Sequence, residues 1–199
     1  MKRIDSNENI SLFYDVFITK FGYLSLIFKE DNVMVGVVLP CSNKDIAILE
    51  TRKFLEKKGF RDYDNIKQKS SPFRSEFKLY FEKKNKNILR NLDSDLDFFK
   101  PTSFQKRVWL NSVKIEKGET MTYKELSDKI STNSYRAVGN ALGKNPLPLI
   151  IPCHRVVSKN GFGGFSAHGG VSMKQKLLLH ERNLRTARES QNVQNPKSI

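Results

Sequence analysis

The first forty residues contain three short apolar runs separated by polar residues, a pattern typical of β-strands. Residues 10–18, 23–28 and 33–39 are short runs rich in aromatic and β-branched side chains, which favour strands. Residues 30–32, Glu-Asp-Asn, separate the last two runs and have the composition of a hairpin turn. The pattern predicts a small sheet at the start of the chain.

Helical spacing follows. Residues 44–58 predict a helix that ends at Gly59. Its expected inner face consists of Ile46, Leu49, Phe54 and Leu55. A second helix is expected over residues 72–85, and the acidic residues 91–97 are interpreted as a turn-rich connection. We place a domain boundary there, with residues 1–97 as an N-terminal α/β structural domain and residues 98–199 as a second, mostly helical domain.

The second half repeats helix signals at short intervals. Thr102 or Ser103 can cap a helix with apolar residues at three-to-four spacing. Thr122 and Glu125 fit a capping box at the start of a short helix. A turn over residues 131–134 leads to another helix, residues 135–142, with Gly143 as its expected stop. Two short helices around a tight turn predict a helix-turn-helix, and the whole chain is of the α+β class.

Charge adds a candidate partner to this outline. The 199 residues carry a net charge of +14, and 38% of them are hydrophobic. Residues 1–100 hold 19 Lys and Arg against 15 Asp and Glu, whereas residues 101–199 hold 16 against 6. A basic second half is the expected footprint of a protein that binds a polyanion such as DNA. A solvated lysine-rich surface is the alternative.

Composition also bounds where the protein works. The first residues, MKRIDSNENI, lack the apolar stretch of a signal peptide, and no segment reaches the roughly 18 apolar residues of a membrane span. The chain has two cysteines, Cys41 and Cys153. We therefore expect a reduced, cytoplasmic protein with access to DNA and no membrane association.

Cys153 lies in the apolar run PLIIPCHRVV, beside His154 and Arg155. It is either a small buried hydrophobe or a nucleophile, because only an ionised thiol attacks well and ionisation needs a base or a positive environment. Neighbours on an extended chain point to opposite sides, so we expect a water molecule between Cys153 and His154. Cys41 has no acid, base or metal-ligand pattern beside it and is interpreted as structural.

The last helix supplies a partner for the histidine. Met173, Leu177, Glu181 and Leu184 recur at helical spacing, which places Glu181 on the apolar stripe. A lone buried carboxylate is costly unless it is paired. A relay from Glu181 through His154 and water to Cys153 is one interpretation. Pairing of Glu181 with Arg155, or exposure of Glu181 to a groove, are the others.

The pentapeptide PCHRV, residues 152–156, resembles the signature of the O6-alkylguanine-DNA alkyltransferases, also called methylated-DNA–protein-cysteine methyltransferases. The resemblance extends from Phe104 to Glu181 and includes RAVGNALGKNPLPLIIPCHRVV and the turn GGFS. It implies a ribonuclease-H-like N-terminal domain and a winged-helix-like C-terminal domain.

The resemblance also implies roles for individual residues. Cys153 would take the alkyl group as a thioether in a single turnover, with His154 and Glu181 as the relay and Asn145 bracing the site. The substrate base would be contacted by Tyr123, Ser166, Val156 and Phe165. DNA would be bound by Arg136, Ala137, Gly139, Lys144 and Tyr123, with Arg136 filling the stack that the flipped base leaves. The implied partner is double-stranded DNA containing O6-alkylguanine, with O4-alkylthymine as an open second substrate, and the implied state is a monomer.

The sequence also departs from the family pattern. Phe165 stands where many members have tyrosine, and His168 is an extra residue in the loop after Ser166. The first domain has one cysteine and no histidine, so the zinc site of some members is not expected, nor is any other metal or cofactor. Two other classes remain open: a helix-turn-helix transcription factor with a structural or sensor cysteine, and a thiol hydrolase or peroxidase using Cys153, His154 and Glu181.

Overall fold

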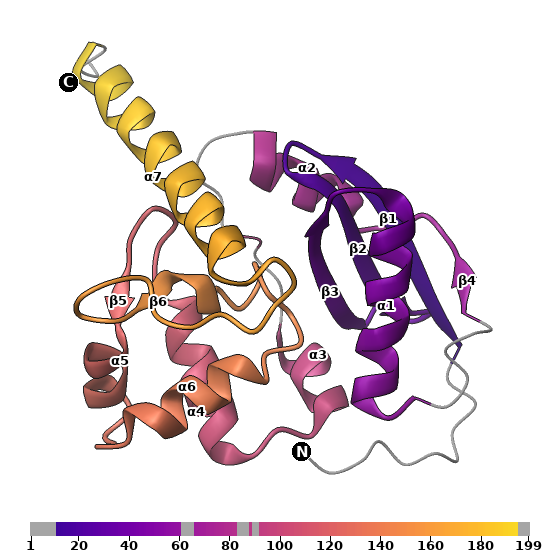
Figure 1. Ribbon diagram of the computed structural model, residues 1–199, viewed down its shortest axis with the longest axis horizontal. Coiled ribbons are helices and arrows are strands. Elements are labelled where there is room, and N and C mark those ends of the chain that lie inside the picture. The colour runs from indigo at the N-terminus through magenta and orange to yellow at the C-terminus, as the bar shows by residue number, and fades with distance from the viewer. Residues whose placement is uncertain (1–10, 61–65, 83–87, 89–91, 195–199) are drawn as a thin grey trace.

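A four-stranded sheet forms the N-terminal part of the molecule (Figure 1). The computed structural model describes residues 11–60, 66–82, 88 and 92–194. The strands are β1 (Leu12–Thr19), β2 (Gly22–Lys29), β3 (Met34–Cys41) and β4 (Lys67–Gln68). Their order is β3-β2-β1-β4, with β4 parallel to β1 and the other pairs antiparallel. The three predicted strands and the turn between the last two are confirmed, except that residue 10 lies outside the described residues.

Helix α1 (Lys44–Lys58) has the predicted bounds and ends at Gly59, whose φ of 86° is left-handed. Its inner face differs from the prediction. The buried residues are Ala47, Thr51 and Leu55, whereas Leu49 is 50% exposed. Leu49 is two residues from Ala47 and therefore lies on the opposite side of the helix. The Thr51 hydroxyl donates to the Ser25 hydroxyl at 2.7 Å, which ties the helix to β2.

Two further helices complete the N-terminal part. Helix α2 (Arg74–Glu82) lies within the predicted range, of which residues 83–85 fall outside the described residues. The turn-rich connection predicted over residues 91–97 is wrong, because Leu92–Phe99 form helix α3. Leu92, Leu96 and Phe99 recur at helical spacing and are buried, and the Asp95 carboxylate accepts the Met34 N–H at 2.8 Å. Residue 91 is not among the described residues.

The C-terminal part is mainly helical. It contains α4 (Ser103–Val113), β5 (Met121–Thr122), α5 (Tyr123–Lys129), α6 (Tyr135–Gly143), the 3₁₀ turn η1 (Cys153–Arg155), β6 (Val156–Val157) and α7 (Gly170–Gln194). Thr102 caps α4 and Thr122 caps α5, each in a capping box. The predicted glycine stop of α6 is wrong, because Gly143 is still helical and Lys144 is the C-cap.

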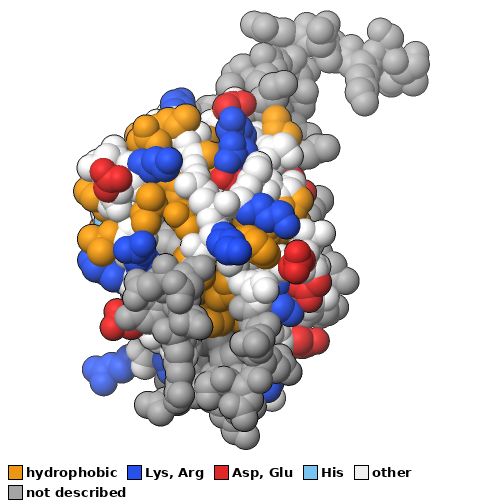
Figure 2. Space-filling view, turned by 90° about the vertical axis from the view of Figure 1, so that its right-hand side faces the viewer, with side chains coloured by type: hydrophobic (Ala, Val, Ile, Leu, Met, Phe, Trp, Pro, Cys, Tyr) orange, Lys and Arg blue, Asp and Glu red, His pale blue; other side chains and the backbone are white. Residues whose placement is uncertain are grey.

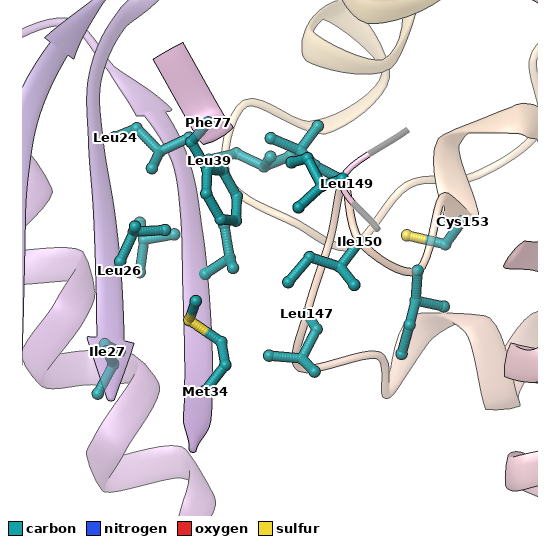
Figure 3. Close-up of a cluster of buried hydrophobic side chains, with 14 of the residues drawn as sticks. Leu24, Leu26, Ile27, Met34, Leu39, Phe77, Leu147, Leu149, Ile150 and Cys153 are labelled. Carbon is teal, nitrogen blue, oxygen red and sulfur yellow. The ribbon is translucent and has the colours of Figure 1, made fainter. Parts of the chain in front are cut away.

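The sheet supports the loop that leads to Cys153. In Figure 3 the side chains of Leu26, Met34 and Leu39 on the sheet face Leu147 and Ile150 of this loop, with Cys153 on the loop's far side. The Val37 N–H donates to the Pro146 carbonyl at 3.1 Å, which joins the loop to β3. The two parts of the chain therefore share one core.

On the outer side of the sheet part, basic, acidic and hydrophobic side chains are interspersed (Figure 2). This mixture agrees with the nearly balanced charge of the first hundred residues. Among the described helices, none is both long and apolar enough to cross a membrane.

Candidate active site

Cys153 opens the 3₁₀ turn η1 and is 8% exposed. The extended backbone expected for this run is wrong. The preceding loop is folded on itself by a hydrogen bond from the Ile151 N–H to the Leu147 carbonyl at 2.8 Å. Buried Leu149 has a φ of 77°, a left-handed conformation that costs ~1–2 kcal/mol in a residue with a Cβ. Tertiary packing holds the loop in this shape.

Asn145 braces both the loop and the sulfur. Its Nδ2 donates to Cys153 Sγ at 3.1 Å and to the Ile151 carbonyl at 2.8 Å. Its Oδ1 accepts the Leu147 N–H at 2.8 Å. One amide side chain thus fixes the loop and points a donor at the sulfur, where it stabilises negative charge.

Glu181 lies on α7 and is fully buried. His154 Nε2 is 3.1 Å from Glu181 Oε1, and Arg155 donates to both carboxylate oxygens, at 2.9 Å from Nε and 2.8 Å from Nη2. Glu181 therefore pairs with both His154 and Arg155, the two partners that the sequence left open. Nδ1 of His154 is buried and has no hydrogen-bond partner among the described residues. With Nε2–H donating to Glu181, Nδ1 is the basic nitrogen of the ring.

Burial governs the charge states of this cluster. It raises the pKa of the Cys153 thiol, against the Asn145 hydrogen bond and the charge of Lys174. It lowers the pKa of His154, against the attraction of Glu181. For Glu181, burial acts to raise the pKa, but His154 and Arg155 outweigh it and hold the pKa well below its ordinary value. The site therefore combines an ionised carboxylate with a neutral imidazole and a neutral thiol.

Tyr123 lies between α6 and the loop before α7. A Cβ on Gly163 would meet Tyr123 Cε2 at 2.9 Å, and a Cβ on Gly139 of α6 would lie 3.8 Å from Tyr123 Cε1. Burial is the larger cause, and the nearby Cys153 the smaller one, of a raised pKa of Tyr123. Its hydroxyl donates to the Gly164 carbonyl at 3.4 Å. The glycine at position 163 therefore leaves room for the Tyr123 ring, whereas a side chain at position 139 would make an ordinary contact with it.

Lys174 is a residue that sequence reasoning missed. It is fully buried, and its ammonium donates to the Val156 carbonyl at 2.6 Å and the Gly164 carbonyl at 3.3 Å. It lies 6.0 Å from the centroid of the Phe165 ring, and burial lowers its pKa to about 8. A signal was present, because Lys174, Leu177 and Glu181 share one helix face.

Tyr80 was missed as well, and no sequence signal could have found it. It lies on α2, 101 residues before Glu181, and its hydroxyl donates to Glu181 Oε1 at 2.5 Å. Nothing in the local pattern of residues 74–82 indicates a partner so far along the chain.

The remaining predicted residues lie on α6, on β6 and in the loop before α7. Arg136 and Lys144 are exposed at opposite ends of α6, and Ala137 is partly buried between them. The exposed Ser166 hydroxyl donates to the Gly143 carbonyl at 3.1 Å. The Val156 side chain is fully buried in β6, so only its backbone can face a ligand.

Comparison with known proteins places this site in a family. A family model described as 6-O-methylguanine DNA methyltransferase, DNA binding domain, matches residues 103–183. A methylated-DNA–protein-cysteine methyltransferase of Metallosphaera sedula is 33% identical over 172 residues, which cover 86% of this chain and 94% of the relative. One from Methanocaldococcus vulcanius is 38% identical over 161 residues, which cover 80% and 91%.

Solved structures agree. The O6-methylguanine methyltransferase of Mycobacterium tuberculosis matches with a TM-score of 0.61 and 27% identity, over 86% of this chain and 93% of that one. The O6-methylguanine-DNA methyltransferase of Pyrococcus kodakaraensis matches with a TM-score of 0.61 and 26% identity, over 85% and 98%. The fold and the relatives define a DNA-binding protein that repairs DNA by alkyl transfer. The chain belongs to the methylated-DNA–protein-cysteine methyltransferase family.

Proposed function

We propose that this protein removes the alkyl group from O6-alkylguanine in double-stranded DNA and keeps it on Cys153. The observation that carries the proposal is the set of contacts at the sulfur and the imidazole: Asn145 donates to Sγ, and His154 is held by buried Glu181. A thioether does not hydrolyse, so each molecule reacts once.

In the proposed reaction, Sγ attacks the alkyl carbon and the bond from that carbon to O6 breaks. The thiol proton passes through a water molecule to His154 Nδ1, and Glu181 stabilises the imidazolium that forms. Negative charge moves onto the departing guanine, where donors at the purine edge stabilise it. Tyr123 and Ser166 are the proposed donors, and Phe165 and the backbone of Val156 line the base.

A base inside a duplex cannot reach Cys153, so the nucleotide must be flipped out at a cost of a few kcal/mol. Arg136 is the proposed finger that fills the stack, since it is exposed at the start of α6. The small residues Ala137 and Gly139 allow the helix to approach the minor groove closely. Lys144 is proposed to contact a phosphate.

We also infer the finer architecture and setting. The order β3-β2-β1-β4 with a parallel β4 supports a ribonuclease-H-like N-terminal domain, and α4 to β6 support a winged-helix-like second domain. The division into residues 1–97 and 98–199 remains a prediction. The protein is proposed to act as a monomer in the cytoplasm.

The test is incubation with duplex DNA containing O6-methylguanine, followed by intact and peptide mass measurement. One methyl group per chain, located on Cys153, is expected, and Cys153→Ala should bind DNA without transfer. Label on Cys41, or several turnovers, would refute the proposal. Sequence-specific binding to undamaged DNA without transfer would favour a transcription factor, and turnover of a small ester or peroxide without DNA would favour a hydrolase or peroxidase. A second arm with O4-methylthymine defines the substrate range.

A further inference from the structure

The carboxylate of the relay receives a hydrogen bond from the sheet-bearing part of the chain. Tyr80 projects from α2, and its hydroxyl lies 2.5 Å from Glu181 Oε1. Tyr80 is 2% exposed and Glu181 is fully buried. A hydrogen bond of this length between a hydroxyl and a carboxylate is of the strong, charge-assisted kind.

The direction of this hydrogen bond is fixed by its surroundings. Burial, and to a smaller extent the charge of Glu181, raise the pKa of Tyr80 well above its ordinary value, so the phenol keeps its proton. Glu181 is ionised, as the contacts with His154 and Arg155 require. The phenol is therefore the donor at every pH at which the protein works.

Tyr80 is itself held in place. The Lys117 ammonium donates to the Tyr80 carbonyl at 2.8 Å and lies 4.0 Å from the centroid of the Tyr80 ring. The Phe81 ring meets the Tyr80 ring edge-on at 5.0 Å. His180 Nε2 lies 3.4 Å from the same carbonyl oxygen. The hydroxyl thus reaches Glu181 from a rigid support.

Three donors share one oxygen. Glu181 Oε1 accepts from Tyr80, from Arg155 Nη2 and from His154 Nε2, while Oε2 accepts from Arg155 Nε and the Gly118 N–H. A donor that takes up part of the charge on Oε1 leaves less of it to stabilise a proton on His154. The charged and titratable groups around Glu181 and His154 are Tyr80, Lys117, Arg155, Lys174 and His180.

We propose that Tyr80 is a positioning residue for alkyl transfer: its hydroxyl orients Glu181, disperses the charge of Oε1 and thereby sets the proton affinity of His154. The inference rests on the proposed function, in which His154 is the base. It also assigns the N-terminal part a role in the chemistry, because α2 supplies a group that the relay needs.

The direct test is a pH titration of His154, monitored through the ¹⁵N chemical shifts of its ring. The chain has three histidines, and His154→Ala assigns the signal. Tyr80→Phe removes the hydroxyl, so the pKa of His154 should rise by about 0.5 to 1. The acidic limb of the rate of transfer from free O6-benzylguanine should move to higher pH by the same amount, because neutral His154 is the base.

The matched control is Tyr23→Phe, the same chemical change in β2, which should leave both quantities unchanged. If Tyr80→Phe does not fold, 3,5-difluorotyrosine placed at position 80 alone keeps the ring and makes it a stronger donor, and the pKa of His154 should then fall. An unchanged pKa, or a change of the opposite sign in either variant, overturns the inference. The titration needs no alkyl transfer, whereas failure of wild-type protein to alkylate Cys153 would refute the proposed function instead.

Discussion

At the scale of single residues, the site must make a buried thiol reactive. Burial alone raises the pKa of Cys153, which favours the unreactive thiol. The opposing groups are the Asn145 amide at 3.1 Å, the charge of Lys174 and the backbone N–H groups of Cys153 and His154. The chemistry therefore depends on residues around the cysteine as much as on the cysteine itself.

Lys174 offers a clean test of this balance. Lys174→Met keeps the length of the side chain and removes its charge, so the pKa of Cys153 should rise by about 1 and alkyl transfer at pH 7 should slow by roughly tenfold. The pH dependence of Cys153 alkylation by iodoacetamide measures the pKa directly. Lys176→Met, the same change at an exposed position of α7, is the control. An unchanged alkylation profile in folded Lys174→Met would show that Lys174 only ties the loop to the helix.

At the scale of elements, α6 carries the proposed DNA contacts at its two ends. If Arg136 enters the base stack, Arg136→Ala should slow repair of duplex substrate by about tenfold or more, yet leave the reaction with free O6-benzylguanine unchanged, because free base needs no flipping. Parallel rate measurements on the two substrates decide this.

Lys144→Ala is the matched control. It should weaken DNA binding and reduce the salt dependence of affinity by about one phosphate contact, whereas Arg136→Ala should leave the salt dependence nearly unchanged. Equal losses on duplex and free base would mean that Arg136 supports the fold or the pocket.

Elements with local signals could be predicted from the sequence. The helix cap at Thr102, the capping box at Thr122 and the glycine stop after α1 depend on neighbouring residues, and the structure confirms them. Elements whose conformation depends on distant partners were missed. Leu92–Phe99 has a turn-like composition but folds as a helix because its apolar residues are buried and Asp95 bonds to Met34.

The same distinction applies to the site. Glu181 could be expected because a carboxylate on an apolar stripe requires a partner, and the partner is present. The left-handed Leu149 and the 3₁₀ turn at Cys153 are imposed by packing of the loop against the sheet, which no local pattern encodes. Tyr80 reaches Glu181 only through the tertiary fold.

At the scale of the whole molecule, the contact between the two parts of the chain includes buried titratable side chains. The Tyr80 carbonyl accepts from Lys117, and the His180 ring stands edge-on to Phe21 at 5.2 Å. These contacts place titratable groups in the shared core, so folding is linked to pH.

Two buried histidines give this linkage its direction. Burial lowers the pKa of both His154 and His180 below the ordinary 6.5. Below pH 6.5 the unfolded chain therefore binds protons that the folded protein does not, and the free energy of unfolding must fall as pH falls from there through the folded pKa values. Glu181 acts in the same direction below its ordinary 4.5, because its folded pKa is also lowered. A pKa that is lower by one in the folded protein than in the unfolded chain corresponds to roughly 1.4 kcal/mol of stability.

Urea unfolding at pH 7.5, 6.5 and 5.5 measures the slope of the free energy of unfolding against pH. His180→Phe should make the slope shallower, because one of the two histidines is removed and the new ring fits beside Phe21 and Phe81, which already contact position 180. The remaining slope then belongs to His154, the residue that must stay neutral to act as a base. A free energy of unfolding that stays constant from pH 7.5 to 5.5 would mean that both rings bind protons equally in the folded and the unfolded chain, which would contradict the lowering of their pKa values by burial.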